Sequence, residues 1–192
     1  MSESVGELTL QGLLDAVGAR TTAPGGGAVT GVVAALAGAL AAMCARFSDG
    51  DQPGLAARAD ELRARAASLA QSDLTVYAAY VRARQAGRDG DVEVIAALDE
   101  TIRVPLEMAE VAAELAELAG GLARSGNPNL RGDATAAVLM GAAAARAGAV
   151  LVCENLAGTG RDPRRARAAA LVASASAAEQ NVLLLYPLLA TP

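Results

Sequence analysis

Residues 27–45 read GAVTGVVAALAGALAAMCA and contain no charged side chain. A run of this length approaches that of a membrane span. However, it consists mainly of Ala and Gly, and no Trp or Tyr belt flanks it. Residues 134–157 form a second apolar stretch, in which Arg146 and Glu154 are the charged side chains. Helices that are apolar almost all round belong inside a core, so we expect both at the centre of a soluble bundle.

Working outward from this stretch, Gly and Pro clusters divide the chain into helices joined by short loops. Pro105 is expected to kink one helix, Gly120-Gly121 to open a loop, and Asp162-Pro163 to start the last helix. No strand-like alternation or internal repeat occurs. The expected helices span residues 4–17, 28–47, 54–86, 91–119, 133–157 and 162–189. The sequence therefore predicts an all-α up-and-down bundle of about five long helices plus a short N-terminal helix.

Length and composition narrow the class of protein. The 192 residues fit a single domain, 1–192, and 53% hydrophobic but only 2% aromatic residues predict a core of Ala, Leu and Val. A net charge of -5 argues against nucleic acid as a partner. The N-terminus lacks the basic segment of a signal peptide, and Cys44 and Cys153 are expected to be buried, reduced thiols. We therefore expect a cytoplasmic protein.

Small residues share one face of the stretch at residues 28–47, namely Gly31, Ala35, Gly38 and Ala42. They permit a close backbone approach, either within the bundle or to a second subunit. The apolar surface is generous for one small domain, so we expect a homodimer.

One residue breaks the apolar pattern of the third helix. Leu55, Ala59, Leu62, Ala66 and Leu69 follow one another at spacings of four and three, and the next position in this rhythm is Asp73. Tyr77 follows one turn later on the same face. Burial raises the pKa of a carboxyl group and brings it toward the range useful for general acid–base catalysis. The alternative is a core Asp satisfied by an Arg or by a helix end.

Other polar groups in apolar surroundings have similar alternatives. Arg146 either forms a structural ion pair or binds an anionic group of a substrate, and Asn155 either binds substrate or links two helices. Asp133 suits a helix N-cap. The turn at Gly25-Gly26-Gly27 either permits close backbone approach to a ligand or is simply a tight turn. The chain has no His, and no metal-binding pattern is recognisable, so we expect neither metal nor cofactor.

Several short motifs occur in the order typical of one family. They are Thr22–Val29 (TAPGGGAV), Asp73–Tyr77 (DLTVY), Val104–Leu106 (VPL), Gly126-Asn127 followed by Asp133, and Asn155-Leu156. Together they resemble the cyclodeaminase domain of formimidoyltransferase-cyclodeaminase and the free-standing methenyltetrahydrofolate cyclohydrolases. The resemblance covers roughly residues 5–160 and implies a dimeric helical bundle.

The resemblance also implies a tetrahydrofolate substrate. One reaction of the family closes 5-formiminotetrahydrofolate to 5,10-methenyltetrahydrofolate with loss of ammonia, and the other hydrolyses the methenyl bridge. By resemblance, Asp73 is the general acid/base and Tyr77 assists it. The implied substrate-binding residues are Pro24, Gly25, Gly26, Gly27, Asn127, Asp133 and Asn155, and Arg146 joins them from its position on the apolar helix rather than from a motif.

The chain also departs from this family pattern. Gly132 stands where the family has Ser, Leu151 where it has Asn, and Arg84–Arg88 (RQAGR) replaces its Leu-Pro-Lys. A second hypothesis is therefore a non-catalytic helical dimer that binds a folate-like ligand or a partner protein. A third is an unrelated structural bundle.

Overall fold

The protein is described here by a computed structural model covering residues 4–48, 52–88, 90–157 and 160–187. Every regular element in these residues is helical, which confirms the all-α prediction. The elements are α1 (Leu10–Gly18), α2 (Gly26–Arg46), α3 (Gln52–Ala86), α4 (Val92–Ser125), the 3-10 turn η1 (Pro128–Leu130), α5 (Arg131–Asn155) and α6 (Pro163–Leu183).

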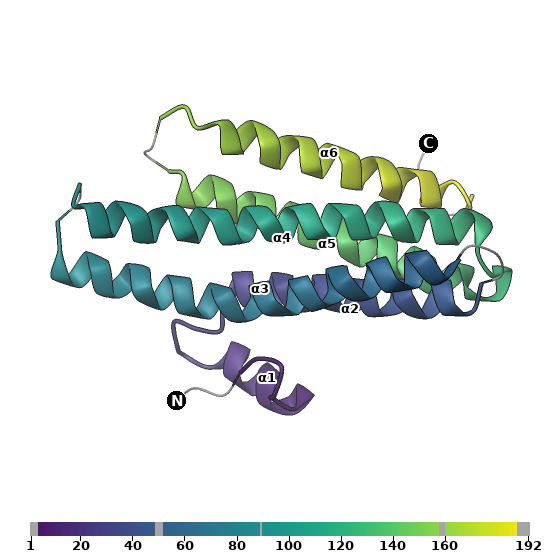
Figure 1. The fold of residues 1–192 in the computed structure, drawn as a ribbon, viewed down its shortest axis with the longest axis horizontal. Coiled ribbons are helices and arrows are strands. Elements are labelled where there is room, and N and C mark those ends of the chain that lie inside the picture. The colour runs from purple at the N-terminus through teal and green to yellow at the C-terminus, as the bar shows by residue number, and fades with distance from the viewer. Residues whose placement is uncertain (1–3, 49–51, 89, 158–159, 188–192) are drawn as a thin grey trace.

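Successive long helices run antiparallel (Figure 1), and α4 contacts each of the other long helices. Helix α2 packs against α3, α4 and α5, while α5 packs against α2, α4 and α6. Both helices have the length and apolar character of a membrane span, but half or more of their most apolar segments is buried within the bundle, 56% for α2 and 50% for α5. The expectation is met in part, because each helix buries one face in the bundle while Leu36 of α2 and Val150 of α5 stay exposed.

Small residues set the spacing between α2 and α3. A methyl group on Gly31 would lie 2.7 Å from Cβ of Ala70, and one on Gly38 would lie 2.9 Å from Cβ of Arg63. Ala42 is buried on the same side. Of the two roles expected for this face, the structure therefore displays packing within the bundle.

Three predicted boundaries are wrong. The first helix begins at Leu10 rather than near Ser4, because the Thr9 hydroxyl accepts a hydrogen bond from the Gly12 N–H at 3.0 Å and caps the helix there. Helix α4 runs through Gly120-Gly121 to Ser125, because Gly120 is buried against α5 and α6, near Val138 and Ala178. The last helix ends at Leu183 rather than near Leu189, which lies outside the described residues.

The thiols are free, as expected, but only Cys44 is buried; Cys153 is exposed on the outer face of α5, contrary to the prediction. Helix α1 lies to one side of the bundle (Figure 1) and none of its residues is buried. Leu10 and Leu14 are exposed on it.

Candidate active site

The apolar seam of α3 leads to the site. Ala59, Leu62, Ala66 and Leu69 are all buried against the core, which confirms the predicted seam. Asp73 is the next residue on this seam, and its side chain is only partly exposed. No ion pair among the described residues includes Asp73, so the carboxylate is not neutralised by an arginine.

The glycine turn brings the start of α2 against this carboxylate. Gly25 is the N-cap residue of α2 and provides no side-chain cap. Asp73 supplies one instead, because the N–H of Ala28 donates a hydrogen bond to its carboxylate. Gly27 makes this approach possible, since a methyl group there would overlap the Asp73 carboxylate.

Two effects act on the pKa of Asp73. Burial raises it, because removal from water disfavours the charged form, and the hydrogen bond from Ala28 partly opposes this effect. Burial is the larger effect, so the pKa of Asp73 lies above its ordinary value. The group is thus suited to take up and release protons.

A cleft of about 220 Å³ opens beside Asp73. The turn before α2 and the middle of α3 form one side of the cleft. Helices α4 and α5 form the other side. The lining residues are Thr22, Ala23, Gly25, Gly26, Gly27, Asp73, Leu74, Tyr77, Pro105, Leu151 and Asn155. The cleft is smaller than the ~300–1,000 Å³ usual for a site that encloses a whole ligand. It therefore suits the reacting end of a larger molecule.

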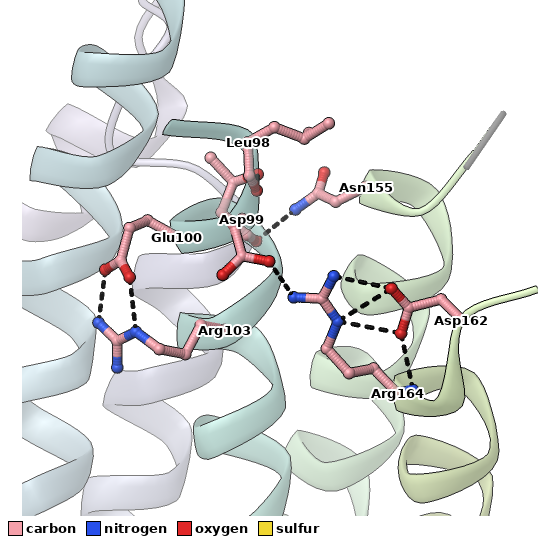
Figure 2. A network of polar contacts seen from close by, with 8 residues as sticks. Leu98, Asp99, Glu100, Arg103, Asn155, Asp162 and Arg164 are labelled. Atoms are coloured by element: carbon pink, nitrogen blue, oxygen red, sulfur yellow. Dashed lines mark hydrogen bonds and ion pairs between the residues drawn. The ribbon is translucent and has the colours of Figure 1, made fainter. Parts of the chain in front are cut away.

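The polar side chains of the cleft come from different helices. Tyr77 lies one turn after Asp73 on α3 and is 44% exposed. Asn155, the last residue of α5, donates a hydrogen bond from Nδ2 to the Thr101 carbonyl of α4 at 2.6 Å (Figure 2). Of the two alternatives for Asn155, the link between two helices is present, and the side chain also lines the cleft.

The structure brings together Asp73, Tyr77, Gly25–Gly27 and Asn155 from the predicted site. Pro24 lies within the same turn, after a cis peptide bond from Ala23, but it does not line the cleft.

Three other predicted site residues lie elsewhere. Asn127 is near the opposite end of α2, where its Nδ2 donates to the Phe47 carbonyl at 2.8 Å. A helix of 21 residues is about 30 Å long, so this point is remote from the cleft. Asp133 is in the first turn of α5, whereas Asn155 is at its last residue.

Arg146 points away from the cleft, toward α6. Its guanidinium pairs with Glu179, with 2.5 Å between Nη1 and Oε2. The ion pair that the sequence allowed for Arg146 is therefore present, and the side chain lines a different, shallow groove between α5 and α6.

Pro105, Leu151 and Leu74 also form walls of the cleft, although they are not among the predicted site residues. In the sequence Pro105 stands out as a helix breaker and as part of the VPL motif, and Leu151 as a departure from a motif, but neither role places it in the site. Leu74 follows Asp73 in the sequence, but the spacing of apolar residues along α3 does not distinguish it from the other leucines of this helix. No cluster of three or more His, Cys, Asp or Glu side chains suited to a metal occurs in the described part of the chain.

Fold and site together define a class of protein: an all-α bundle with a half-buried carboxylate at the N-terminus of α2. Residues 9–175 match the family model described as formiminotransferase-cyclodeaminase, so the chain belongs to this family. The resemblance inferred from the motifs is thus confirmed.

A solved structure agrees with this assignment. The crystal structure of formiminotetrahydrofolate cyclodeaminase from Thermotoga maritima matches with a TM-score of 0.85 and 28% sequence identity, over 95% of this chain and 98% of that chain. No curated protein matches the chain.

Proposed function

We propose that this protein is a folate one-carbon enzyme, either a formimidoyltetrahydrofolate cyclodeaminase or a methenyltetrahydrofolate cyclohydrolase, with Asp73 as its general acid/base. The observation that supports this most strongly is the position of Asp73. Its carboxylate lies in a cleft, is removed from bulk water, and is held by the Ala28 N–H rather than by an arginine. The solved relative named as a formiminotetrahydrofolate cyclodeaminase adds weight to this choice of substrate.

The chemistry requires a group of this kind. In the cyclodeaminase reaction N10 attacks the carbon of the protonated formimino group and the N10–H proton is removed. The departing nitrogen, which already carries two hydrogens, gains one more and leaves as ammonia. In the hydrolysis of the methenyl bridge, water replaces N10 as the nucleophile and must lose a proton. One carboxyl group with a raised pKa serves both proton transfers, and such catalysis contributes about 10²–10⁴-fold. Tyr77 lies close enough along α3 to assist Asp73.

The decisive experiment is turnover by Asp73→Asn. The absorbance of 5,10-methenyltetrahydrofolate reports both reactions, as its appearance from the formimino substrate or its loss by hydrolysis. We expect Asp73→Asn to lower kcat by about 10²-fold or more while helicity by circular dichroism stays unchanged. Full activity in this variant would remove Asp73 from the mechanism.

Asp133→Asn is the matched control, since it makes the same chemical change in the first turn of α5. We expect wild-type turnover. A comparable loss in this control would bring Asp133 into the site, as the family resemblance implies.

We also propose that the protein is a cytoplasmic homodimer, and the size of the cleft supports the homodimer. At about 220 Å³ the cleft accommodates only part of a folate, and α1 leaves Leu10 and Leu14 uncovered. Covering them with a second copy would bury apolar surface. Light scattering after size exclusion tests this, and a monomeric mass at micromolar concentration would contradict it.

A second candidate function is a non-catalytic folate-binding bundle. Leu151 favours it, because an apolar side chain lines the cleft where the family has Asn. Calorimetry with tetrahydrofolate and the turnover assay distinguish the two functions. Binding without turnover of either substrate would support this second candidate.

A further inference from the structure

Pro105 leaves one carbonyl of α4 without its helical partner. In an α-helix the N–H of residue 105 would donate to the carbonyl of Thr101, but proline has no N–H. Helix α4 nevertheless runs unbroken through Pro105, which is buried. The amide of Asn155 replaces the missing donor, with Nδ2 at 2.6 Å from the Thr101 oxygen (Figure 2). A buried carbonyl left unpaired is costly, so this bond is a strong constraint on the Asn155 side chain.

The constraint also fixes which end of the Asn155 amide faces α4. A carbonyl oxygen accepts hydrogen bonds only, so the NH₂ group must point to Thr101, and the reversed amide would set two oxygens against each other. Figure 2 shows the amide oxygen of Asn155 directed away from that bond. Because Asn155 lines the cleft with Asp73 and Pro105 and its Oδ1 takes no part in the bond to Thr101, the amide offers this oxygen to a ligand as an acceptor, beside the second hydrogen of Nδ2.

We propose that Asn155 Oδ1 is a substrate-binding acceptor for an N–H of the one-carbon unit, and that Pro105 is the positioning residue that holds it in this orientation. The proposal rests on the proposed function and narrows it to one reaction. The formimino group carries N–H on its terminal nitrogen, whereas the methenyl carbon is bonded to N5 and N10, neither of which carries hydrogen. A fixed acceptor therefore binds the formimino substrate in preference to the methenyl substrate, which favours the cyclodeaminase reaction.

The balance of the reaction agrees with this placement. The N10–carbon bond forms, the bond from carbon to the terminal nitrogen breaks, and ammonia leaves. The terminal nitrogen of the protonated formimino group starts with two hydrogens. Asp73 takes the N10 proton and passes it to this nitrogen, so that NH3 leaves and the positive charge stays on the methenyl product. The Asn155 oxygen holds an N–H of that nitrogen, which orients it for departure. The other α5 residue in the cleft, Leu151, has no polar side-chain atom to share this role.

A pair of substitutions separates this role from the structural link between helices. Asn155→Leu removes the acceptor and also leaves the Thr101 carbonyl unpaired, so we expect a lower Tm and about a tenfold lower kcat/KM for 5-formiminotetrahydrofolate. Adding Pro105→Ala restores a backbone N–H to the same carbonyl. We expect the double variant to regain Tm but to keep the tenfold loss. Recovery of kcat/KM together with Tm would overturn the proposal, because Asn155 would then act only through the fold.

Pro105→Ala alone tests the positioning role. The backbone N–H restored by this substitution competes for the Thr101 carbonyl and frees the Asn155 amide to turn, so we expect a raised KM for the formimino substrate with little change in kcat. An unchanged KM would contradict positioning by Pro105. Arg164→Gln is the control, because Arg164 bridges α4 and α6 through Asp99 at 2.5 Å in the same region but does not line the cleft (Figure 2). We expect it to lower Tm without changing KM.

Failure of the proposed function can be distinguished from failure of the acceptor role proposed for Asn155. If the wild type turns over neither substrate, the enzyme assignment fails, but calorimetry with 5-formiminotetrahydrofolate still tests the acceptor. We then expect about tenfold weaker binding by the double variant than by the wild type. Equal affinities would overturn the acceptor by itself.

Discussion

A polar side chain from the predicted site lies against each end of α2, and the two differ in how they are satisfied: Asp73, predicted to be catalytic, lies at the N-terminal end, and Asn127, predicted to bind substrate, at the C-terminal end. At the C-terminal end, Asn127 donates to the Phe47 carbonyl and accepts from the Asn129 N–H at 3.0 Å, so both halves of its amide hold the backbone. At the N-terminal end, the Asp73 carboxylate receives the Ala28 N–H and borders a cleft. The first arrangement fastens a loop, and the second leaves an ionisable group available for chemistry.

The difference shows that polarity in an apolar stretch does not by itself mark a site. Arg146 is also polar and lies on an apolar helix, yet Glu179 neutralises it. Asp73 differs because burial, rather than a partner of opposite charge, dominates its pKa. If this distinction is correct, substitutions that disturb Asp73 lower turnover, whereas substitutions of Asn127 and Arg146, whose polar groups are already paired, affect stability alone.

The largest expected effect comes from Gly27→Ala. The new methyl group would overlap the Asp73 carboxylate and force it out of its position beside Ala28. We expect turnover to fall by about 10²-fold, since small misplacements of catalytic groups have effects of this size. Stopped-flow absorbance of methenyltetrahydrofolate measures it.

Gly121→Ala is the matched control for that experiment. Gly121 also lies within a helix, but a methyl group there meets no atom within 4 Å. We expect unchanged turnover and a stability gain of up to about 1 kcal/mol from the better helix propensity of Ala. Wild-type turnover in Gly27→Ala would show that the close approach of Asp73 to α2 is not needed.

Asn127→Ala has the next largest effect, and it falls on stability alone. The substitution removes two hydrogen bonds, each contributing about 0.5–1.5 kcal/mol. For a chain of this size we expect Tm to fall by about 2–4 °C per kcal/mol lost. Thermal unfolding measures this, with turnover at 25 °C as the companion assay. A raised KM would indicate that Asn127 contacts substrate.

Arg146→Gln should have a smaller effect on stability. The pair with Glu179 is partly exposed, and such pairs contribute about 0–1 kcal/mol. Urea unfolding measures the change, and KM serves as the second readout. If KM rises while stability is unchanged, Arg146 contacts substrate after all.

Periodicity was sufficient to predict the helices and the exceptional position of Asp73, because both follow from local spacing along the chain. The boundaries were harder to predict, because tertiary contacts decide them. Gly120 stays helical only since α5 and α6 approach it closely. The exposed Cys153 shows the same limit, because an apolar stretch does not reveal which of its faces the neighbouring helices cover.

The composition of the cleft depended on contacts between segments distant in sequence. Asn155 and Pro105 are separated by 50 positions, and only the helical partner missing at Thr101 connects them. Part of this connection can be predicted from the sequence, because a proline within a helix leaves the carbonyl four residues earlier without its N–H donor. Which side chain then satisfies the carbonyl depends on how α4 and α5 pack, and the sequence does not specify this.

The smallest effect is a dependence of stability on pH that Asp73→Asn should remove. Because burial raises the pKa of Asp73 in the folded state, the folded protein binds more protons than the unfolded chain at pH values between the two pKa values. The contribution of Asp73 to stability therefore decreases as pH rises through this window and stays at its lowest once the folded carboxyl group is ionised. Asn keeps an acceptor for the Ala28 N–H without the cost of a buried charge. We expect Asp73→Asn to be more stable than the wild type at pH 7 to 8, and the difference to vanish as pH falls toward about 4, near the unperturbed pKa of Asp. Urea unfolding of both proteins across this pH range measures it. If Asp73→Asn is less stable than the wild type at pH 8, the ionised carboxylate stabilises the start of α2 by more than its burial costs. Asp73 would then be a stabilising cap, as Asn127 is a stabilising link, and the two ends of α2 would differ only in how strongly their polar side chains are held.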